Sequence, residues 1–502
     1  MMDISPGRSS FNESYAAGRS QVVWTELPAD IDTPVSVMLK LGQERRFTAL
    51  LESVQGGNTR GRYSFIALDP DVVWRCNGAA AEICRDVREG TLRYAPESLP
   101  ALGSLRALLQ DSRIELPSHL PPNSAGLMGY MGYDTVRLAE SIPNKNPDTL
   151  GIPDGMFMRP TVTVIFDNVD DVMTVVVPVY QKADMTADLA YDIATKRIHN
   201  IVARLSAAVP HTIPSSAPRP ETPVSNVGRD GYHRMVERAK EYIRAGDIFQ
   251  VVPSQRFRLP FALPSFALYR SLRRTNPSPF LFHLNLDGFA IVGSSPEILV
   301  RLRDGVVTIR PIAGTRPRGK TKAEDDALAA ELLDDPKELA EHLMLLDLGR
   351  NDVGRVCKSG SVRVTEQMVI ERYSHVMHIV SNVEGDLAPQ YDAMDALMAG
   401  FPAGTVSGAP KIRAMEIIDE LEGERRGFYG GAIGYLSVNG EMDTCIALRT
   451  ALVKDGEIVI QAGGGVVADS DPEAEFQESN NKARALIRAA EEAVRFFAGG
   501  NT

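Results

Sequence analysis

The chain has few cysteines and none of the paired spacings that bind zinc. Its four cysteines are Cys76, Cys84, Cys357 and Cys445, and no two of them form a CxxC pair. This pattern fits neither a zinc site nor the disulfide framework of a small secreted domain. The first residues also lack the apolar segment of a signal peptide. Together these absences predict a protein of the reducing cytoplasm.

Long apolar runs and an excess of positive charge are also missing. No run reaches the roughly 18 apolar residues that a membrane-spanning helix needs. The formal net charge is −11, which opposes nonspecific binding to nucleic acid or to an anionic membrane surface. We therefore expect no nucleic-acid and no membrane partner. An anionic substrate stays possible, because a local cluster of cations or a metal ion can reverse the charge of a site.

The common nucleotide and hydrolase motifs are absent. The glycine-rich stretch GTVSGAPK at 404–411 lacks the GK[ST] ending of a phosphate-binding loop, and YGGAIG at 429–434 is not GxGxxG. The sequence contains no HExxH and no GxSxG motif. Nucleotide binding and serine hydrolysis are both disfavoured.

The composition changes once along the chain. Residues 206–226 are rich in Pro, Ser and Thr, which predicts an exposed linker between an N-terminal part, 1–205, and a C-terminal part, 227–497. Hairpin-length connections such as 453–456 favour antiparallel pairing. The predicted class is α+β, with large, mostly antiparallel sheets and flanking helices. Among the expected elements are a hairpin of strands 162–166 and 173–180, a helix at 231–245, strands at 248–253 and 444–454, and a helical stretch at 323–347.

Two pairs of glutamates lie on predicted helices. Glu338 and Glu341 are three residues apart, as are Glu475 and Glu478, so each pair shares one helix face. Either pair alone is more often a solvated surface. Brought together, four carboxylates would suit a hard cation such as Mg²⁺. Lys482 follows Glu478 by four residues, on much the same face. The run Gly463, Gly464 and Gly465 precedes the second pair and would let backbone approach a ligand closely.

Read together, the C-terminal segments resemble the chorismate-utilising enzymes, and most of all the anthranilate synthase large subunits. The matching segments include DIFQVVPSQRF (247–257), GSSPEILVRL (293–302), RPIAGTRPRG (310–319), DPKELAEHLMLLDLGRNDVGRVC (335–357), YSHVMHIVS (373–381), FPAGTVSGAPKIRAMEII (401–418), DTCIALRTALV (443–453) and AGGGVVADSDPEAEFQESNNKARA (462–485). They keep the family's order across most of 230–490. The resemblance implies the family fold and a substrate, chorismate, that reacts with ammonia to give anthranilate and pyruvate.

The resemblance also implies roles for individual residues. Glu341 and Glu478 match Mg²⁺ ligands, with Glu338 and Glu475 close by. Glu297 matches a general acid, which the poorly leaving ring hydroxyl requires. His378 matches a histidine beside the ring that assists proton removal; on a strand it could equally be a hydrogen-bonded structural residue.

Substrate contacts follow from the same alignment of motifs. Arg449 would bind the enolpyruvyl carboxylate through its guanidinium fork, with Tyr429 beside it. A lone arginine in the apolar stretch CIALRTALV is costly to bury unpaired, which favours a ligand role. The remaining contacts implied by the resemblance are Gly314, Thr315, Thr405, Gly463, Gly464, Gly465 and Lys482.

Two positions distinguish members of the family. Isochorismate and salicylate synthases place a lysine where this chain has Gln250, because water as a nucleophile needs a base. Aminodeoxychorismate synthases place a lysine nucleophile where this chain has Ala313. Gln250 with Ala313 therefore points to direct attack by ammonia and to anthranilate.

The family pattern also implies partners. No glutaminase signature is present in the chain, so we expect a separate glutamine amidotransferase subunit and a hetero-oligomer. The N-terminal part resembles the regulatory region that binds L-tryptophan as an inhibitor. The matching residues are Ser53 in LLES and Pro279 and Leu281 in NPSPFLF, where leucine replaces the family's methionine. LLES could instead be the end of a buried strand.

Two other functions remain open from the sequence. The enzyme could stop at the aminated intermediate, 2-amino-2-deoxyisochorismate, without losing pyruvate. Alternatively, the chain could be a tryptophan-binding regulatory subunit without activity, although Glu297, Glu341, Glu478, Arg449 and Lys482 are all present.

Overall fold

Strands from both parts of the chain form one large sheet. The computed structural model describes residues 2–42, 45–55, 59–87, 91–210, 222–373 and 376–498. In these residues a sheet of 21 strands is accompanied by the two-stranded pair β10–β19, and the pairings are antiparallel. The α+β class with large antiparallel sheets and flanking helices is confirmed.

The N-terminal part contributes strands of uneven length and a few short helices. Its elements are α1 (Arg8–Ala16), β1 (Gln21–Pro28), α2 (Pro34–Gly42), β2 (Thr48–Gln55), β3 (Thr59–Asn77), β4 (Ala80–Cys84), β5 (Ala95–Pro96), α3 (Ala101–Asp111), β6 (Gly126–Met131), η1 (Tyr133–Leu138), β7 (Gly155–Asp167), β8 (Val172–Val179) and α4 (Ala187–Leu205). The predicted hairpin is confirmed as β7 and β8, which pair antiparallel.

The C-terminal part alternates strand pairs with longer helices. It begins with β9 (Val224–Ser225), α5 (Gly228–Ala245), β10 (Gln250–Val251), β11 (Ser254–Pro260), α6 (Ser265–Thr275), β12 (Phe280–Leu286), β13 (Phe289–Ser295), β14 (Ile298–Arg303), β15 (Val306–Ile309), β16 (Ile312–Pro317), α7 (Lys322–Asp334) and α8 (Pro336–Gly354). It continues with β17 (Arg363–Arg372), β18 (Val376–Asp386), α9 (Ala393–Gly400), η2 (Gly404–Val406), β19 (Gly408–Ala409), α10 (Lys411–Leu421), β20 (Ala432–Ser437), β21 (Met442–Ile446), β22 (Thr450–Lys454), β23 (Glu457–Gly463) and α11 (Pro472–Ala498).

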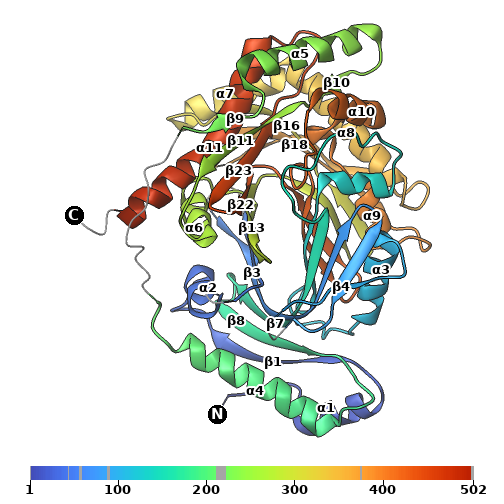
Figure 1. The fold of residues 1–502 in the computed structure, drawn as a ribbon, viewed down its shortest axis with the longest axis vertical. Coiled ribbons are helices and arrows are strands. Elements are labelled where there is room, and N and C mark those ends of the chain that lie inside the picture. The colour runs from blue at the N-terminus through green and yellow to red at the C-terminus, as the bar shows by residue number, and fades with distance from the viewer. Residues whose placement is uncertain are drawn as a thin grey trace.

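The two parts are interleaved. β2 pairs with β12, and β6 pairs with β20, so N-terminal strands join two groups of C-terminal strands. One group runs β12–β13–β22–β23–β11, and the other runs β20–β21–β14–β15–β18. In Figure 1 the helices α5, α7, α8, α10 and α11 lie at one end of the molecule, and α1 and α4 lie at the other, beside β1 and β8.

The hydrophobic cores contain side chains of both parts. One buried cluster holds Phe11, Leu50 and Ile198 from the N-terminal part together with Leu268 and Leu486 from the C-terminal part. Burying apolar surface stabilises by about 25 cal/mol per Å² removed from water. Because both parts bury apolar side chains in the same cluster, the N-terminal part contributes to the stability of the whole sheet.

Three predicted elements differ from the structure. The helical stretch 323–347 is two helices, α7 and α8, because Asp335 caps a new helix that begins at Pro336, whose fixed φ favours a first helical position. Of the strand predicted at 248–253, only β10 (Gln250–Val251) forms, and the next strand, β11, begins at Ser254. The strand predicted at 444–454 is interrupted between β21 and β22, at residues 447–449.

The predicted linker lies only partly within the described residues. Residues 211–221 fall outside them. At the end of the predicted segment, β9 pairs with β11, so Val224 and Ser225 belong to the sheet rather than to an exposed linker. In the part of the chain that the structure covers, no helix has the length and apolarity needed to cross a membrane.

Candidate active site

Two neighbouring loops each connect a strand of one C-terminal group to a strand of the other group. β13 pairs with β22 in one group, and β14 pairs with β21 in the other. The β13–β14 connection carries Glu297 and the β21–β22 connection carries Arg449. Backbone hydrogen bonds join the crossings: Ser294 N–H donates to the carbonyl oxygen of Arg449 at 3.1 Å, and Ile446 N–H donates to that of Glu297 at 3.1 Å. The crossing fixes these two side chains relative to each other.

Glu297 is a buried carboxyl with an unusual protonation state. Its side chain is almost completely buried. Burial raises the pKa of Glu297 to about 8, and the nearby Thr405 hydroxyl, the backbone N–H of Ile312 and the charge of Arg449 offset this only in part. At neutral pH the group is therefore largely a carboxylic acid that can donate a proton. Thr405 shares with it a small cavity of about 30 Å³.

Arg449 is a positively charged side chain that could bind an anion. Its φ is +48°, which is rare for a residue with a side chain and explains why the predicted strand breaks here. Within the described residues its guanidinium forms no ion pair, and Tyr373 and Glu297 are the groups that act on its charge. Burial lowers the pKa of Arg449, but an arginine stays charged at neutral pH. A guanidinium without an ion pair favours a carboxylate ligand.

His378 on β18 has a defined tautomer. Its Nδ1 lies 2.8 Å from the carbonyl oxygen of Gly314 and 3.1 Å from the hydroxyl of Thr315. A carbonyl oxygen only accepts, so Nδ1 carries the hydrogen and Nε2 keeps the lone pair. Burial lowers the pKa of His378 to about 4. The imidazole is therefore neutral at pH 7, and its part in proton removal stays a prediction.

The glycine run allows close packing around the end of β23. A Cβ on Gly463 would lie 2.4 Å from the carbonyl oxygen of Pro253, and one on Gly464 would lie 2.7 Å from a carboxylate oxygen of Glu475. Gly464 N–H donates to the hydroxyl of Tyr232 at 3.1 Å. No larger residue fits at Gly463 without moving backbone, so the run forms a tight wall of main chain.

Tyr429 lies beside a buried ion pair. The guanidinium of Arg426 lies 5.4 Å from the centre of the Tyr429 ring and pairs with Glu422 at 2.6 Å. Burial raises the pKa of Tyr429 to about 12, so its hydroxyl stays protonated and can donate a hydrogen bond.

Gln250 connects the short strand β10 to helix α8. Its Nε2 donates to Glu341 Oε1 at 3.1 Å, and its Oε1 is buried without a partner among the described groups. A Cβ on Gly465 would lie 2.6 Å from Gln250 Nε2, so this glycine leaves space for the amide. The free amide oxygen is an acceptor for a small N–H donor.

The glutamate pairs of α8 and α11 influence one another. Burial raises the pKa of Glu341, and the charges of Glu338 and Glu478 raise it further. Burial and Glu478 likewise raise the pKa of Glu475. Two distant segments therefore bring four carboxylates into one electrostatic neighbourhood; that they bind Mg²⁺ stays a prediction.

Cations already neutralise part of this group. Lys482 pairs with Glu478 at 2.7 Å, and Arg316 pairs with Glu338 at 3.2 Å. Lys482 also donates to the carbonyl oxygen of Gly463 at 3.0 Å, which ties α11 to the glycine wall.

The carboxylates fit a shared cation rather than a closed metal cage. Among the described residues, no three His, Cys, Asp or Glu side chains lie close enough to hold a metal by themselves. One oxygen of Glu475 accepts from Ser470 at 2.7 Å, while its Oε2 is buried without a partner. Oxygen donors with free lone pairs suit Mg²⁺, which usually keeps few protein ligands and completes its shell with substrate and water.

A second cavity, of about 360 Å³, contains two of the residues predicted to bind tryptophan. Ser53 and Leu281 both line it, on strands β2 and β12, which pair with each other. Pro279, the third predicted residue, is not among its lining residues. The wall also includes Arg301 and Arg303. Asp443 pairs with Arg301 at 3.0 Å through Oδ2, while its Oδ1 is buried without a partner in the described structure.

Two groups of functional residues escaped the sequence reasoning. Tyr373 packs its ring 5.6 Å from that of His378 and acts on the charge of Arg449. Behind Ser53, Glu52 is buried, pairs with Arg273 at 2.7 Å and accepts a hydrogen bond from Tyr269. The lone glutamate in the apolar run LLES could have indicated a buried partner for Glu52. Nothing in the sequence indicates a role for Tyr373.

Comparison with known proteins places the chain in a family. A family model described as "chorismate binding enzyme" matches residues 69–488. The chain belongs to the chorismate-binding enzymes. The anthranilate synthase component 1 of Cereibacter sphaeroides is 58% identical over 97% of this chain and 98% of its own length. The predicted resemblance to the anthranilate synthase large subunits is confirmed.

Solved structures of other chorismate-binding enzymes share the fold. Anthranilate synthase component I from Streptococcus pneumoniae matches with a TM-score of 0.75 and 37% identity, over 92% of this chain and 99% of that one. The menaquinone-specific isochorismate synthase MenF of Escherichia coli matches with a TM-score of 0.71 at 19% identity, over 96% and 99%. The second likeness shows the fold alone.

Proposed function

We propose that this chain is the large subunit of an anthranilate synthase, a lyase that converts chorismate and ammonia to anthranilate and pyruvate. The observation that carries the proposal is the buried Glu297 carboxyl, which is largely protonated at neutral pH and lies beside the unpaired Arg449. A ring hydroxyl leaves only when it is protonated, and a carboxylate substrate needs a cation to hold it. The four free cysteines suit the reducing cytoplasm that we predict.

The residues divide the chemistry among them. Arg449 holds the enolpyruvyl carboxylate, Glu297 protonates the leaving hydroxyl, and His378 Nε2 accepts a proton as the ring becomes aromatic. Water as the nucleophile would need a base at position 250 to remove its proton. Gln250 offers only an amide there, which favours ammonia as the nucleophile. Ala313, largely buried on β16, offers no covalent nucleophile.

Mg²⁺ would be held by Glu341 and Glu478, with Glu338 and Glu475 next to them. The ion supplies electrostatic attraction for the ring carboxylate of chorismate. In its absence the same carboxylates would repel that anion, apart from the charge that Lys482 and Arg316 neutralise.

A partner and an inhibitor complete the proposal. Ammonia is scarce at neutral pH because ammonium dominates, so a glutamine amidotransferase subunit would supply it in a hetero-oligomer. L-tryptophan would bind in the cavity at Ser53 and Leu281. The unpartnered Asp443 oxygen suits its ammonium group, and Arg301 or Arg303 suits its carboxylate.

The test is product identification with the purified full chain, chorismate, Mg²⁺ and ammonium salt at mildly alkaline pH. Fluorescent anthranilate that forms without a second subunit and disappears with EDTA would support the proposal. Consumption of chorismate without anthranilate would point to 2-amino-2-deoxyisochorismate. No consumption, even with a glutaminase subunit and glutamine, would favour a regulatory subunit without activity.

A further inference from the structure

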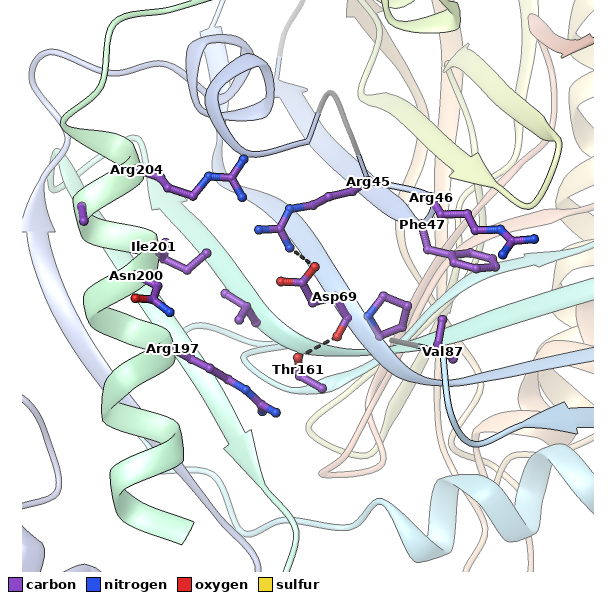
Figure 2. A pocket seen from close by; sticks show the side chains of 13 residues that line it. Arg45, Arg46, Phe47, Asp69, Val87, Thr161, Arg197, Asn200, Ile201 and Arg204 are labelled. Atoms are coloured by element: carbon purple, nitrogen blue, oxygen red, sulfur yellow. Dashed lines mark hydrogen bonds and ion pairs between the residues drawn. The ribbon is translucent and has the colours of Figure 1, made fainter. Parts of the chain in front are cut away.

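A large cavity in the N-terminal part lies outside both sites described above. It has a volume of about 830 Å³ and opens between helix α4 and strands β3 and β7 (Figure 2). Its polar wall is formed by Arg45, Arg46, Asp69, Thr161, Arg197, Asn200 and Arg204. None of its lining residues belongs to the candidate active site or to the cavity at Ser53.

Among the residues that the structure describes, the wall of this cavity carries four arginines and a single carboxylate. Arg45 pairs with Asp69, and Arg46 pairs with Asp287 at 2.7 Å. Figure 2 shows Arg197 and Arg204 extending from α4 toward the strands that carry Asp69 and Thr161. In a chain with a net charge of −11, this accumulation of cations is a local reversal of sign.

Arg45 and Arg204 approach each other at the C-terminal end of α2. Arg45 Nε donates to the carbonyl oxygen of Leu41, and Arg204 Nη2 donates to that of Lys40 at 3.1 Å. Among the described residues Arg204 has no carboxylate partner. Burial, and then the charge of Arg204, lowers the pKa of Arg45 to about 10. Asp69 pairs with Arg45 but not with Arg204 among the described residues, so an anion that contacts both guanidinium groups would relieve the repulsion that remains between them.

We propose that this cavity binds a small phosphate-bearing anion between Arg45 and Arg204. A phosphate group carries up to two charges and at least three acceptor oxygens, so it can accept from guanidinium forks on two walls at once. A single carboxylate satisfies one fork. Asn200 adds an amide donor from α4. The neighbouring Pro70, Val87, Val162 and Ile201 give an apolar surface for the rest of an organic phosphate.

The test is isothermal titration of the full chain with pyrophosphate and, separately, with inorganic phosphate. Sodium acetate at the same ionic strength distinguishes phosphate recognition from general anion attraction. We expect saturable binding of pyrophosphate that weakens as salt rises. Arg204→Gln should weaken it about tenfold or more, since it removes a charged hydrogen-bond donor. Asn200→Asp, an exposed isosteric change on α4, should weaken it similarly by adding negative charge.

The controls separate binding from folding. Arg19→Gln removes an exposed arginine outside the cavity and should bind pyrophosphate like the unaltered chain. If Arg204→Gln fails to fold because it loses its contacts with the end of α2, Asn200→Asp decides. The proposal is overturned by no saturable binding at millimolar pyrophosphate, by equal binding of acetate, or by a folded Asn200→Asp variant that binds unchanged. All variants should keep the basal chorismate activity.

Discussion

Glu297 and Arg449 face one site from two adjacent strand crossings, and each influences the ionisation of the other. The carboxyl stays largely protonated despite the cation beside it, because burial outweighs the attraction. The arginine in turn keeps its charge without a fixed carboxylate partner in the described structure. This arrangement places an acid near a cation, as the proposed expulsion of a hydroxyl group from a carboxylate substrate requires.

The pH profile should show the ionisation of Glu297. Glu297 must be protonated to act, so kcat/KM for chorismate should fall as pH rises through about 8. The measurement is the initial rate of anthranilate formation at a constant concentration of un-ionised ammonia, so that the supply of nucleophile does not change with pH. A profile that stays flat through this range would mean that Glu297 is not the acid.

Arg449→Lys should weaken chorismate binding while the fold is kept. Lysine retains the positive charge but loses the guanidinium fork that contacts both carboxylate oxygens. We expect KM for chorismate to rise about tenfold, the equivalent of ~1.4 kcal/mol. Arg350→Lys is the matched control, since Arg350 is exposed on α8 and pairs only with Asp347. Equal KM values in the two variants would remove Arg449 from the substrate site.

Gly463→Ala should destabilise the protein. The added methyl group would lie 2.4 Å from the carbonyl oxygen of Pro253, which is backbone and cannot rotate away. Overpacking of this kind costs about 1–3 kcal/mol, measurable as a lower free energy of unfolding in urea. Gly354→Ala at the end of α8 has open space around the new methyl group and should be neutral or slightly stabilising. Similar losses in both variants would contradict the tight packing.

Asp443→Asn should relieve inhibition by tryptophan without lowering basal activity. The change removes the negative charge that would pair with the ligand's ammonium group, and Asp443 lies outside the candidate active site. Inhibition curves with and without the substitution, at constant chorismate, measure the effect as a higher inhibitory concentration. Inhibition as strong as in the unaltered chain would place the effector elsewhere.

The sequence names candidate site residues but not the arrangement around them. Motif order identified Glu297, His378, Arg449 and the glutamates of α8 and α11, because family resemblance follows residues that chemistry constrains. The pairing of β2 with β12 depends on contacts between segments more than 200 positions apart, which local periodicity does not encode. The positive φ of Arg449 is likewise set by the strand crossing rather than by neighbouring residues.

Other features were hidden because their parts are dispersed. The arginines of the N-terminal cavity come from the segment after α2 and from α4, and neither segment is basic enough to attract attention alone. The break between α7 and α8 was visible as Asp335 and Pro336, yet the continuous helical pattern on both sides concealed it. Tyr373 comes near His378 and Arg449 only through the tertiary fold.

The most direct test of the central claim compares the unaltered chain with Glu297→Gln in anthranilate formation from chorismate, ammonium salt and Mg²⁺. Glutamine keeps the shape of the buried side chain but cannot donate the proton. The account predicts a fall in kcat of about 10²–10⁴-fold, with KM for chorismate nearly unchanged and the fold intact. A Glu297→Gln variant that forms anthranilate at the unaltered rate would contradict it.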